Sequence, residues 1–372
     1  MTCAPAYTPP RLHALYRALR PLLFRLDAER AHGLGTALAR AAPPSLLGRL
    51  FPAPDERLAQ TVWGLRFRGP VGLAAGFDKN ATGVAAWRGF GFGFAEVGSV
   101  TARPGGGNPR PRAFRLVADR ALVNRMGLGN EGAEAVARRL AATPRAADFV
   151  VGVNVAKTHD PAILGADAVD DFRDAARALL PHADYLALNV SCPNTAEGKT
   201  FETPEALDAL LAAVAPLAGD VPLVVKLSPP PPGGVDAGAV NELVAVALAH
   251  GVSGFIATNT ASDRAGLRTP PDVLARVGVG GVSGPPLFAR SRALVRHLHR
   301  ATGGRVPIVG VGGVDSVDAA WAMVSAGASL LQLYAGLVYE GPGLPSRLHA
   351  GLLRRLDAAG LDRLADAVGR DA

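Results

Sequence analysis

Short apolar stretches alternate with longer amphipathic stretches from residue 71 onward. The apolar stretches are rich in Val, Ile and Leu, which is typical of parallel strands that are covered on both faces. They lie at residues 71–75, 94–100, 149–155, 185–190, 223–227, 254–258, 307–311 and 330–334. Helices are predicted at residues 131–141, 168–180, 204–217, 237–249, 287–301, 316–326 and 346–358. This alternation predicts an α/β fold, a TIM (β/α)8 barrel, with a doubly wound open sheet as the alternative.

Residues 1–50 have a different pattern. Leucines recur at helical spacing through residues 11–24 with arginines between them, and Asp27 can cap a second helix that the Pro-Pro pair at 43–44 would end. We therefore predict a small N-terminal α-helical extension (residues 1–50) before a barrel domain (residues 51–372). Two amphipathic helices with a basic face suit a membrane interface, and simple packing on the barrel is the alternative.

The uncharged run at residues 319–339 is long enough to span a bilayer. Its middle reads Ser-Ala-Gly-Ala-Ser, and it becomes strand-like at residues 330–334. A buried helix, turn and strand is therefore the better interpretation.

Charge and cysteine content narrow the functional classes. The net charge of the 372 residues is +7, without a long Lys/Arg block, which favours anionic ligands or lipid and makes nucleic acid an unexpected partner. The two cysteines, Cys3 and Cys192, cannot build an iron–sulfur or zinc site in this chain, and we predict no metal. No signal peptide is visible and Cys3 lies near a terminus, so a reducing compartment is expected.

Polar residues or glycines stand at the carboxyl end of every predicted strand. These ends face one mouth in a barrel, which is where such folds place their chemistry. Amides and two lysines can bind a polar heteroaromatic ring and a carboxylate or phosphate. The strand-end residues include Asp78, Lys79, Ser99, Asn154, Asn189, Lys226, Thr258, Asn259, Thr260 and Tyr334.

Two glycine-rich segments need separate interpretation. Residues 310–313 read Gly-Val-Gly-Gly and precede a helix expected near Ser316, so backbone N–H groups there can bind phosphate; residues 281–284 could supply a second close backbone approach. Residues 127–132 match G-x-G-x-x-G, but they do not follow a clear strand and do not open a βαβ unit. We interpret this match as chance and do not expect NAD.

Several segments resemble signatures of the dihydroorotate dehydrogenase family, in the family's order and across essentially the whole chain. The N-terminal helix pair, with residues 24–32, resembles the quinone-linked class (class 2) of that family, which docks on the membrane surface; soluble members lack it. The signature-like segments are residues 74–80, 107–116, 124–127, 152–154, 189–194, 225–229, 258–260 and 311–314.

This resemblance implies a flavoprotein with FMN as cofactor, (S)-dihydroorotate as substrate, orotate as product and a membrane quinone as electron acceptor. It implies a step of de novo pyrimidine (UMP) biosynthesis, on the cytoplasmic face of the inner cell membrane, with peripheral attachment. The alternatives are a soluble dihydroorotate dehydrogenase that uses fumarate or a partner subunit, another FMN-dependent barrel oxidoreductase, or a barrel that has lost turnover.

Residue by residue, the resemblance implies a cofactor group, a substrate group and a quinone group. The FMN group is Ala75, Gly76, Lys79, Ser99, Asn154, Asn189, Lys226, Thr258, Gly284, Gly313, Tyr334 and Ala335. The substrate group is Lys79, Asn124, Asn189, Asn194, Asn259 and Thr260. The quinone group is His32, Arg115 and Tyr334; the alternative for His32 and Arg115 is a surface ion-pair role.

The resemblance also implies that Cys192 is the catalytic base, which takes the C5 proton while hydride passes from C6 to the flavin N5. The alternative is a small buried apolar residue. Quinone-linked members usually carry serine here, and cysteine is the hallmark of soluble members. A thiol has a pKa near ~8.5, so flavin reduction is predicted to titrate with a thiol-like pKa. Leu128 and Gly129 are a second departure, because the family commonly has Phe-Asn there.

Overall fold

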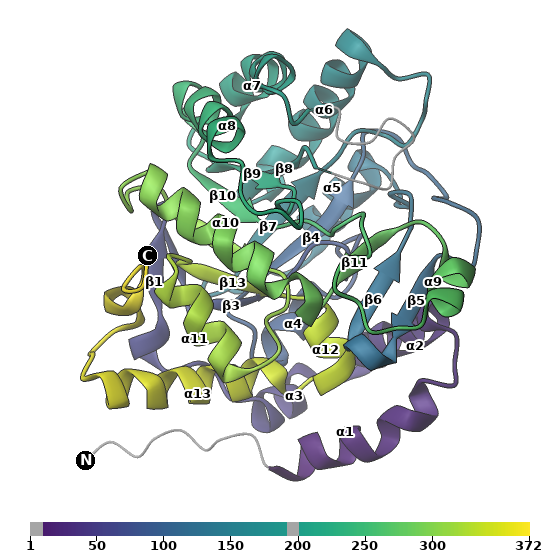
Figure 1. The fold of residues 1–372 in the computed structure, drawn as a ribbon, viewed down its shortest axis with the longest axis vertical. Coiled ribbons are helices and arrows are strands. Elements are labelled where there is room, and N and C mark those ends of the chain that lie inside the picture. The colour runs from purple at the N-terminus through teal and green to yellow at the C-terminus, as the bar shows by residue number, and fades with distance from the viewer. Residues whose placement is uncertain (1–9, 192–200) are drawn as a thin grey trace.

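A computed structural model of the chain describes residues 10–191 and 201–372, and its centre is a closed barrel of eight parallel strands (Figure 1). The strands, in barrel order, are β10 (Gly254–Ala257), β12 (Ile308–Val311), β13 (Leu330–Leu333), β3 (Val71–Leu73), β4 (Phe94–Val100), β7 (Val150–Val155), β8 (Tyr185–Asn189) and β9 (Leu223–Leu227). Pairing of β10 with β9 closes the ring. The predicted TIM barrel is therefore confirmed, and the open sheet is wrong.

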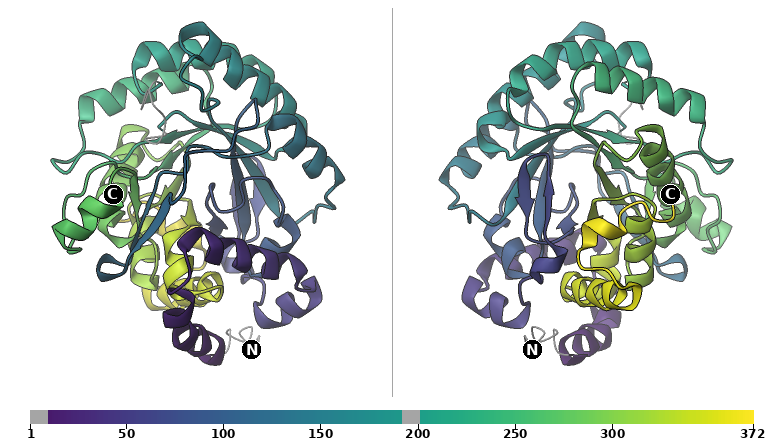
Figure 2. Two further views of the ribbon diagram at one scale, coloured as in Figure 1. Left: turned by 90° about the vertical axis from the view of Figure 1, so that its right-hand side faces the viewer. Right: turned by 90° about the vertical axis from the view of Figure 1, so that its left-hand side faces the viewer.

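Helices cover the outside of this barrel (Figures 1 and 2). They are α4 (Val84–Gly89), α5 (Ala133–Ala142), α6 (Gly165–Leu179), α7 (Pro204–Ala218), α8 (Ala237–Ala249), α10 (Phe288–Ala301), α11 (Val317–Ser325), α12 (Ala335–Glu340) and α13 (Leu344–Ala359). Helix α9 (Pro271–Val277) packs instead against the small sheet beside the barrel mouth. All seven helices predicted for the barrel region are present, within a few residues of the predicted ends.

The uncharged run at residues 319–339 forms α11, a turn and β13, as predicted, and then the start of the unpredicted α12. Helix α11 ends at Ser325 and β13 begins at Leu330. Within residues 10–191 and 201–372, no helix is both long and apolar enough to cross a membrane.

A hairpin closes the amino-terminal end of the barrel. It consists of β1 (Gln60–Val62) and β2 (Leu65–Phe67), which pair antiparallel. The ring of Phe67 packs edge-on against Phe94 with centroids 5.1 Å apart, and the indole of Trp63 donates to the carbonyl of Ser253, just before β10. Because this end is filled by apolar side chains, only the carboxyl ends of the strands are available for a binding site.

A three-stranded antiparallel sheet lies beside the barrel mouth. Its strands are β5 (Ala113–Leu116), β6 (Ala121–Asn124) and β11 (Gly281–Ser283), in the order β11-β6-β5. Strand β6 ends three residues before Gly127, so the statement that residues 127–132 follow no clear strand is wrong. The strand is antiparallel and lies outside the barrel, so it does not open a βαβ unit either.

The N-terminal extension consists of α1 (Pro10–Leu23), α2 (Ala28–Ala41) and an unpredicted α3 (Pro44–Leu50), which lie at one edge of the molecule (Figure 2). Asp27 caps α2 as predicted, because its carboxylate accepts from the backbone N–H groups of Glu29 and Arg30. Helix α1 docks on α12, since the hydroxyl of Tyr16 donates to the carbonyl of Val338 at 2.7 Å. The extension therefore packs on the barrel.

Candidate active site

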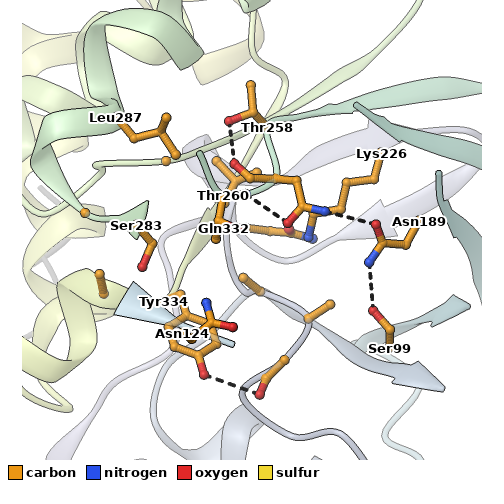
Figure 3. A pocket seen from close by; sticks show the side chains of 18 of the residues that line it. Ser99, Asn124, Asn189, Lys226, Thr258, Thr260, Ser283, Leu287, Gln332 and Tyr334 are labelled. Carbon is orange, nitrogen blue, oxygen red and sulfur yellow. Dashed lines mark hydrogen bonds between the residues drawn. The ribbon is translucent and has the colours of Figure 1, made fainter. Parts of the chain in front are cut away.

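The barrel mouth contains a pocket, and most residues predicted for the site line it (Figure 3). These residues come from the ends of many different strands, so the closed barrel brings together positions that are far apart in the sequence. The predicted residues that line the pocket are Ala75, Gly76, Lys79, Ser99, Asn124, Asn189, Lys226, Thr258, Asn259, Thr260, Gly284, Gly313, Tyr334 and Ala335.

The remaining predicted residues lie elsewhere. Asn154 is fully buried beneath the pocket, where its side-chain carbonyl accepts from the hydroxyl of Ser99. His32, on α2 of the extension, and Arg115, on β5 beside the barrel mouth, do not line the pocket. Cys192 and Asn194 are outside the described residues.

Amide side chains cross the base of the pocket as a connected chain. The amide nitrogen of Asn259 donates to the side-chain carbonyl of Asn189 at 3.0 Å. The amide nitrogen of Asn189 in turn donates to the hydroxyl of Ser99, also at 3.0 Å (Figure 3). These bonds fix which end of each amide faces a ligand, because an amide presents a donor on one side and an acceptor on the other.

Lys79 stands at the side of the pocket nearest the extension. Burial, followed by repulsion from Arg112, lowers the pKa of Lys79 to about 8, and the nearby Glu29 offsets part of this shift. Glu29 belongs to α2 and accepts from the guanidinium of Arg112 at 2.8 Å. The extension therefore contributes a carboxylate to the electrostatics of the pocket. A desolvated ammonium of this kind is well suited to bind an anionic ligand.

The glycine-rich turn after β12 has the shape of a phosphate cradle. Gly312 and Gly313 have φ values of 115° and 77°, which side chains other than glycine rarely adopt. The hydroxyl of Ser316 caps α11 by accepting from the N–H of Ala319, so the predicted helix start is confirmed. Gly284, directly after β11, also has a positive φ of 109°. These backbones can approach a phosphate closely.

Two buried polar atoms in this pocket have no hydrogen-bond partner among residues 10–191 and 201–372. They are the side-chain carbonyl oxygen of Gln332 and the hydroxyl of Thr260, and both residues line the pocket. Buried polar atoms normally have hydrogen-bond partners. Two such atoms without partners in one pocket therefore indicate a polar ligand that hydrogen-bonds to them. Gln332 was not predicted as a site residue. Its signal was a single polar side chain in an apolar strand.

The comparisons with known proteins agree with this geometry. The profile of the dihydroorotate dehydrogenase family matches residues 57–356. Two relatives named dihydroorotate dehydrogenase (quinone) are similar to the chain: one from Rhodococcus opacus (45% identity, covering 96% of this chain and 99% of that protein) and one from Anaeromyxobacter dehalogenans (46%, covering 96% and 97%). This chain belongs to the quinone-dependent class of the dihydroorotate dehydrogenase family.

Solved structures of the family have the same fold. The Eimeria tenella DHODH in complex with ferulenol matches with a TM-score of 0.82 at 32% identity, covering 93% of this chain and 96% of that one. The ligand-free form from the same organism gives a TM-score of 0.82 at 33% identity, with 93% and 99% covered. Because the coverage includes most of each chain, the likeness extends to the arrangement of the whole molecule.

A row of aromatic rings in contact with one another leads from the pocket wall to the extension. The ring of Tyr334 lies edge-on to Phe77 with centroids 5.5 Å apart, and Phe77 lies edge-on to His32 at 4.6 Å. His32 belongs to α2, and burial followed by the charge of Lys79 lowers its pKa. The lowered pKa favours the neutral imidazole, and the rings connect the pocket wall to α2.

Arg115 lies at a second contact between the barrel and the extension. Its guanidinium lies over the ring of Phe24, 4.8 Å from the centroid, and donates to the carbonyl of Leu26 at 2.8 Å. Burial lowers the pKa of Arg115, and Tyr339 and Tyr16 lie close enough to affect it. A guanidinium bordered by aromatic rings and helix ends can offer hydrogen bonds to a ligand that enters between α1 and α2.

Proposed function

We propose that this protein is a quinone-linked dihydroorotate dehydrogenase, which uses FMN to oxidise (S)-dihydroorotate to orotate and passes the electrons to a membrane quinone. The main observation that supports this proposal is a single pocket at the barrel mouth. It combines two lysines and several amides with the side-chain oxygens of Gln332 and Thr260, which have no partner among the described residues. The names of the relatives support the same activity and hence a role in pyrimidine synthesis.

The pocket suits FMN in both its polar and its phosphate-binding parts. The backbones at Gly312, Gly313 and Gly284 would hold the phosphate, and Lys226 and Gln332 would face the polar edge of the ring system. When bound, FMN supplies the acceptor for the hydride. The remaining residues of the proposed cofactor group are Ala75, Gly76, Lys79, Ser99, Asn154, Asn189, Thr258, Tyr334 and Ala335.

The substrate would lie above the ring, held by Lys79 and the amides of Asn124, Asn189 and Asn259, with Thr260 beside them. Lys79 would bind its carboxylate, because a partly desolvated ammonium gains most from an anionic partner. Asn194 would complete the amide set, and Cys192 would take the C5 proton. General-base assistance of this kind contributes roughly 10²–10⁴-fold to a rate.

The extension would bind the membrane surface and admit the quinone. Its exposed surface carries seven leucines together with arginines, a combination that suits a lipid interface. The aromatic rings and Arg115 would then line the quinone's path to Tyr334. Peripheral attachment to the cytoplasmic face of the membrane is part of this proposal. The leucines exposed on residues 15–46 are Leu15, Leu19, Leu22, Leu26, Leu34, Leu38 and Leu46.

Vesicle binding tests the role of the extension. The wild type is expected to co-sediment with vesicles that contain anionic lipid, and a Leu19→Glu/Leu22→Glu variant is expected to remain in solution with an unchanged flavin spectrum. Leu248→Glu is a matched control, because Leu248 is exposed on α8. Equal binding of all three proteins would contradict a role of the extension in membrane binding.

An anaerobic titration tests the function itself. Dihydroorotate is expected to bleach the visible absorbance of the flavin, and a soluble quinone analogue is expected to restore it rapidly. Recovery only with fumarate would assign the soluble class, which Cys192 favours and the helical extension opposes. A flavin that dihydroorotate does not bleach would exclude the proposed substrate and leave only an FMN-binding barrel.

A further inference from the structure

A carboxylate lies inside the barrel, below the pocket. Glu96 on β4 is fully buried, and four side chains of the described residues present donors to its carboxylate. One carboxylate oxygen accepts from Asn154 at 3.0 Å and lies 3.9 Å from the ammonium of Lys226. The other accepts from the hydroxyl of Tyr185 at 2.9 Å and from the amide of Gln332 at 2.7 Å. All four of these groups are donors, which is what a buried carboxylate anion requires.

This anion gives the amide chain across the pocket base a single direction. Asn154 donates its amide N–H to Glu96, so its carbonyl must face the hydroxyl of Ser99. Ser99 then donates to Asn154 and accepts from Asn189, which leaves the carbonyl of Asn189 to accept from Asn259. Every link donates towards Glu96. A neutral group in its place could donate as well as accept, and the direction would no longer be fixed.

The same anion orients two groups of the pocket wall. The amide nitrogen of Gln332 donates to Glu96, so its side-chain carbonyl oxygen is turned away and has no partner in the described part of the chain. Lys226 lines the pocket only 6% exposed, and its charge is balanced in part by Glu96 beneath it. Both groups would face the polar edge of a bound flavin.

We propose that Glu96 is a positioning residue that sets the reduction potential of the bound flavin by partly neutralising Lys226. This inference rests on the proposed function, in which FMN occupies the pocket. A flavin gains negative charge on reduction, and a nearby ammonium stabilises that charge more strongly in a buried, weakly polarisable site. Glu96 weakens this stabilisation, so it keeps the potential low and favours the transfer of electrons to the quinone.

The test is the midpoint potential of the flavin in the Glu96→Gln holoenzyme, measured by spectroscopic titration against reference dyes. Glutamine has the same shape and no charge, so the potential is expected to rise by about 30 mV or more, a tenfold change in a two-electron equilibrium. Tyr185→Phe is the matched control: it removes a donor to Glu96 without removing the charge. Its shift is expected to be less than half as large.

An unchanged or lower potential in Glu96→Gln would overturn the proposal, and so would an equal shift in Tyr185→Phe. If Glu96→Gln loses its flavin, the midpoint potential cannot be measured and urea unfolding is used instead. It compares the single variants Glu96→Gln and Lys226→Met with their double variant. Removing one member of a buried pair leaves an unpaired charge or an unmatched acceptor, so the double variant is expected to lose less stability than the two single variants together. Additive losses would overturn the pairing.

The potential is measured without dihydroorotate, so its result does not depend on the proposed substrate. If the midpoint potentials are as expected but dihydroorotate does not bleach the flavin, the proposed reaction is contradicted and the role of Glu96 still holds. A wild-type chain that binds no FMN would overturn both.

Discussion

The imidazole of His32 lies edge-on against the ring of Phe77, with centroids 4.6 Å apart. This contact joins α2 of the extension to the turn after β3, and Phe77 continues it to Tyr334 on the pocket wall. The extension is therefore connected to the pocket wall through Phe77, and a change in this contact is expected to affect events on the extension side of the flavin more than events on the substrate side.

Replacing His32 by alanine is expected to slow reoxidation of the flavin by quinone about tenfold, the equivalent of losing one contact of about 1.4 kcal/mol. Its reduction by dihydroorotate should change less than twofold. Stopped-flow absorbance of the two half-reactions separates the effects. His297→Ala on α10 is the control, because His297 lies on the barrel exterior. Equal slowing of both half-reactions in His32→Ala would argue against a path along these rings.

Glu340 connects the extension to the barrel and supplies a second prediction. Its carboxylate accepts from Arg120 at 2.6 Å and from Arg347 at 2.7 Å, and its backbone carbonyl lies 3.1 Å from the imidazole of His13 on α1. Burial alone would raise the pKa of Glu340, but the bonds from Arg120 and Arg347 outweigh it and lower the pKa below the usual 4.5.

Glu340→Gln is therefore expected to lower the free energy of unfolding by about 2 kcal/mol at pH 7, typical of hydrogen bonds to a charged group. A depressed carboxyl pKa stabilises the folded state above the unfolded-state pKa, and this contribution is lost as pH falls through the folded-state pKa. Urea unfolding at pH 7 should thus separate variant and wild type, and the gap should narrow below pH 4.5. Glu134→Gln, in an exposed pair with Arg138, should cost less than about 0.5 kcal/mol. A gap that persists in acid would contradict this ionic role.

Sequence patterns alone predicted the barrel because its strands are continuous apolar runs with clear helices between them. The cap at Asp27 was equally readable, since a side chain that binds its own helix start needs no distant partner. By contrast, the sheet beside the mouth joins β6 to β11 through pairing of Asn124 with Gly281. These strands have only three or four residues and pair with strands far away in the sequence. Such short strands leave no periodic signal, so they were missed.

In the pocket, polar residues at strand ends were predicted correctly to converge, because parallel strands end at one mouth. The residues beneath it were harder to find. Glu96 and Gln332 each stand inside an apolar strand, and only the closed barrel decides that they face inwards and meet. The only signal in the sequence was a charged residue, Glu96, within an apolar strand. Such a residue needs a polar partner, but the sequence does not identify which residue that is.

The lowered pKa of Lys79 predicts how binding depends on pH. Below about pH 8 the amine is charged in the free pocket, and above it the amine becomes neutral. The affinity for orotate, whose carboxylate needs the cation, should therefore weaken as pH rises past 8, by up to about tenfold per pH unit. Titration of the flavin absorbance with orotate from pH 6 to 10 measures the Kd. Lys79→Arg, which stays charged across this range, should lose the pH dependence. A wild-type Kd that is constant up to pH 10 would exclude Lys79 as the carboxylate ligand.

Cys192 lies outside the described residues, and its predicted role as base is tested by rates at saturating dihydroorotate. At saturating substrate the pH dependence of binding through Lys79 no longer affects the rate. The pH dependence of the reduction rate then reflects the protonation state of the base. The wild-type rate should rise towards a plateau with a pKa near ~8.5 unless the site shifts the thiol. Cys192→Ser should need higher pH, because an alcohol is a far weaker acid than a thiol. Cys192→Ala should lose roughly 10²–10⁴-fold while it still binds orotate. Full-speed reduction in Cys192→Ala would remove Cys192 as the base and direct the search to another group above the flavin.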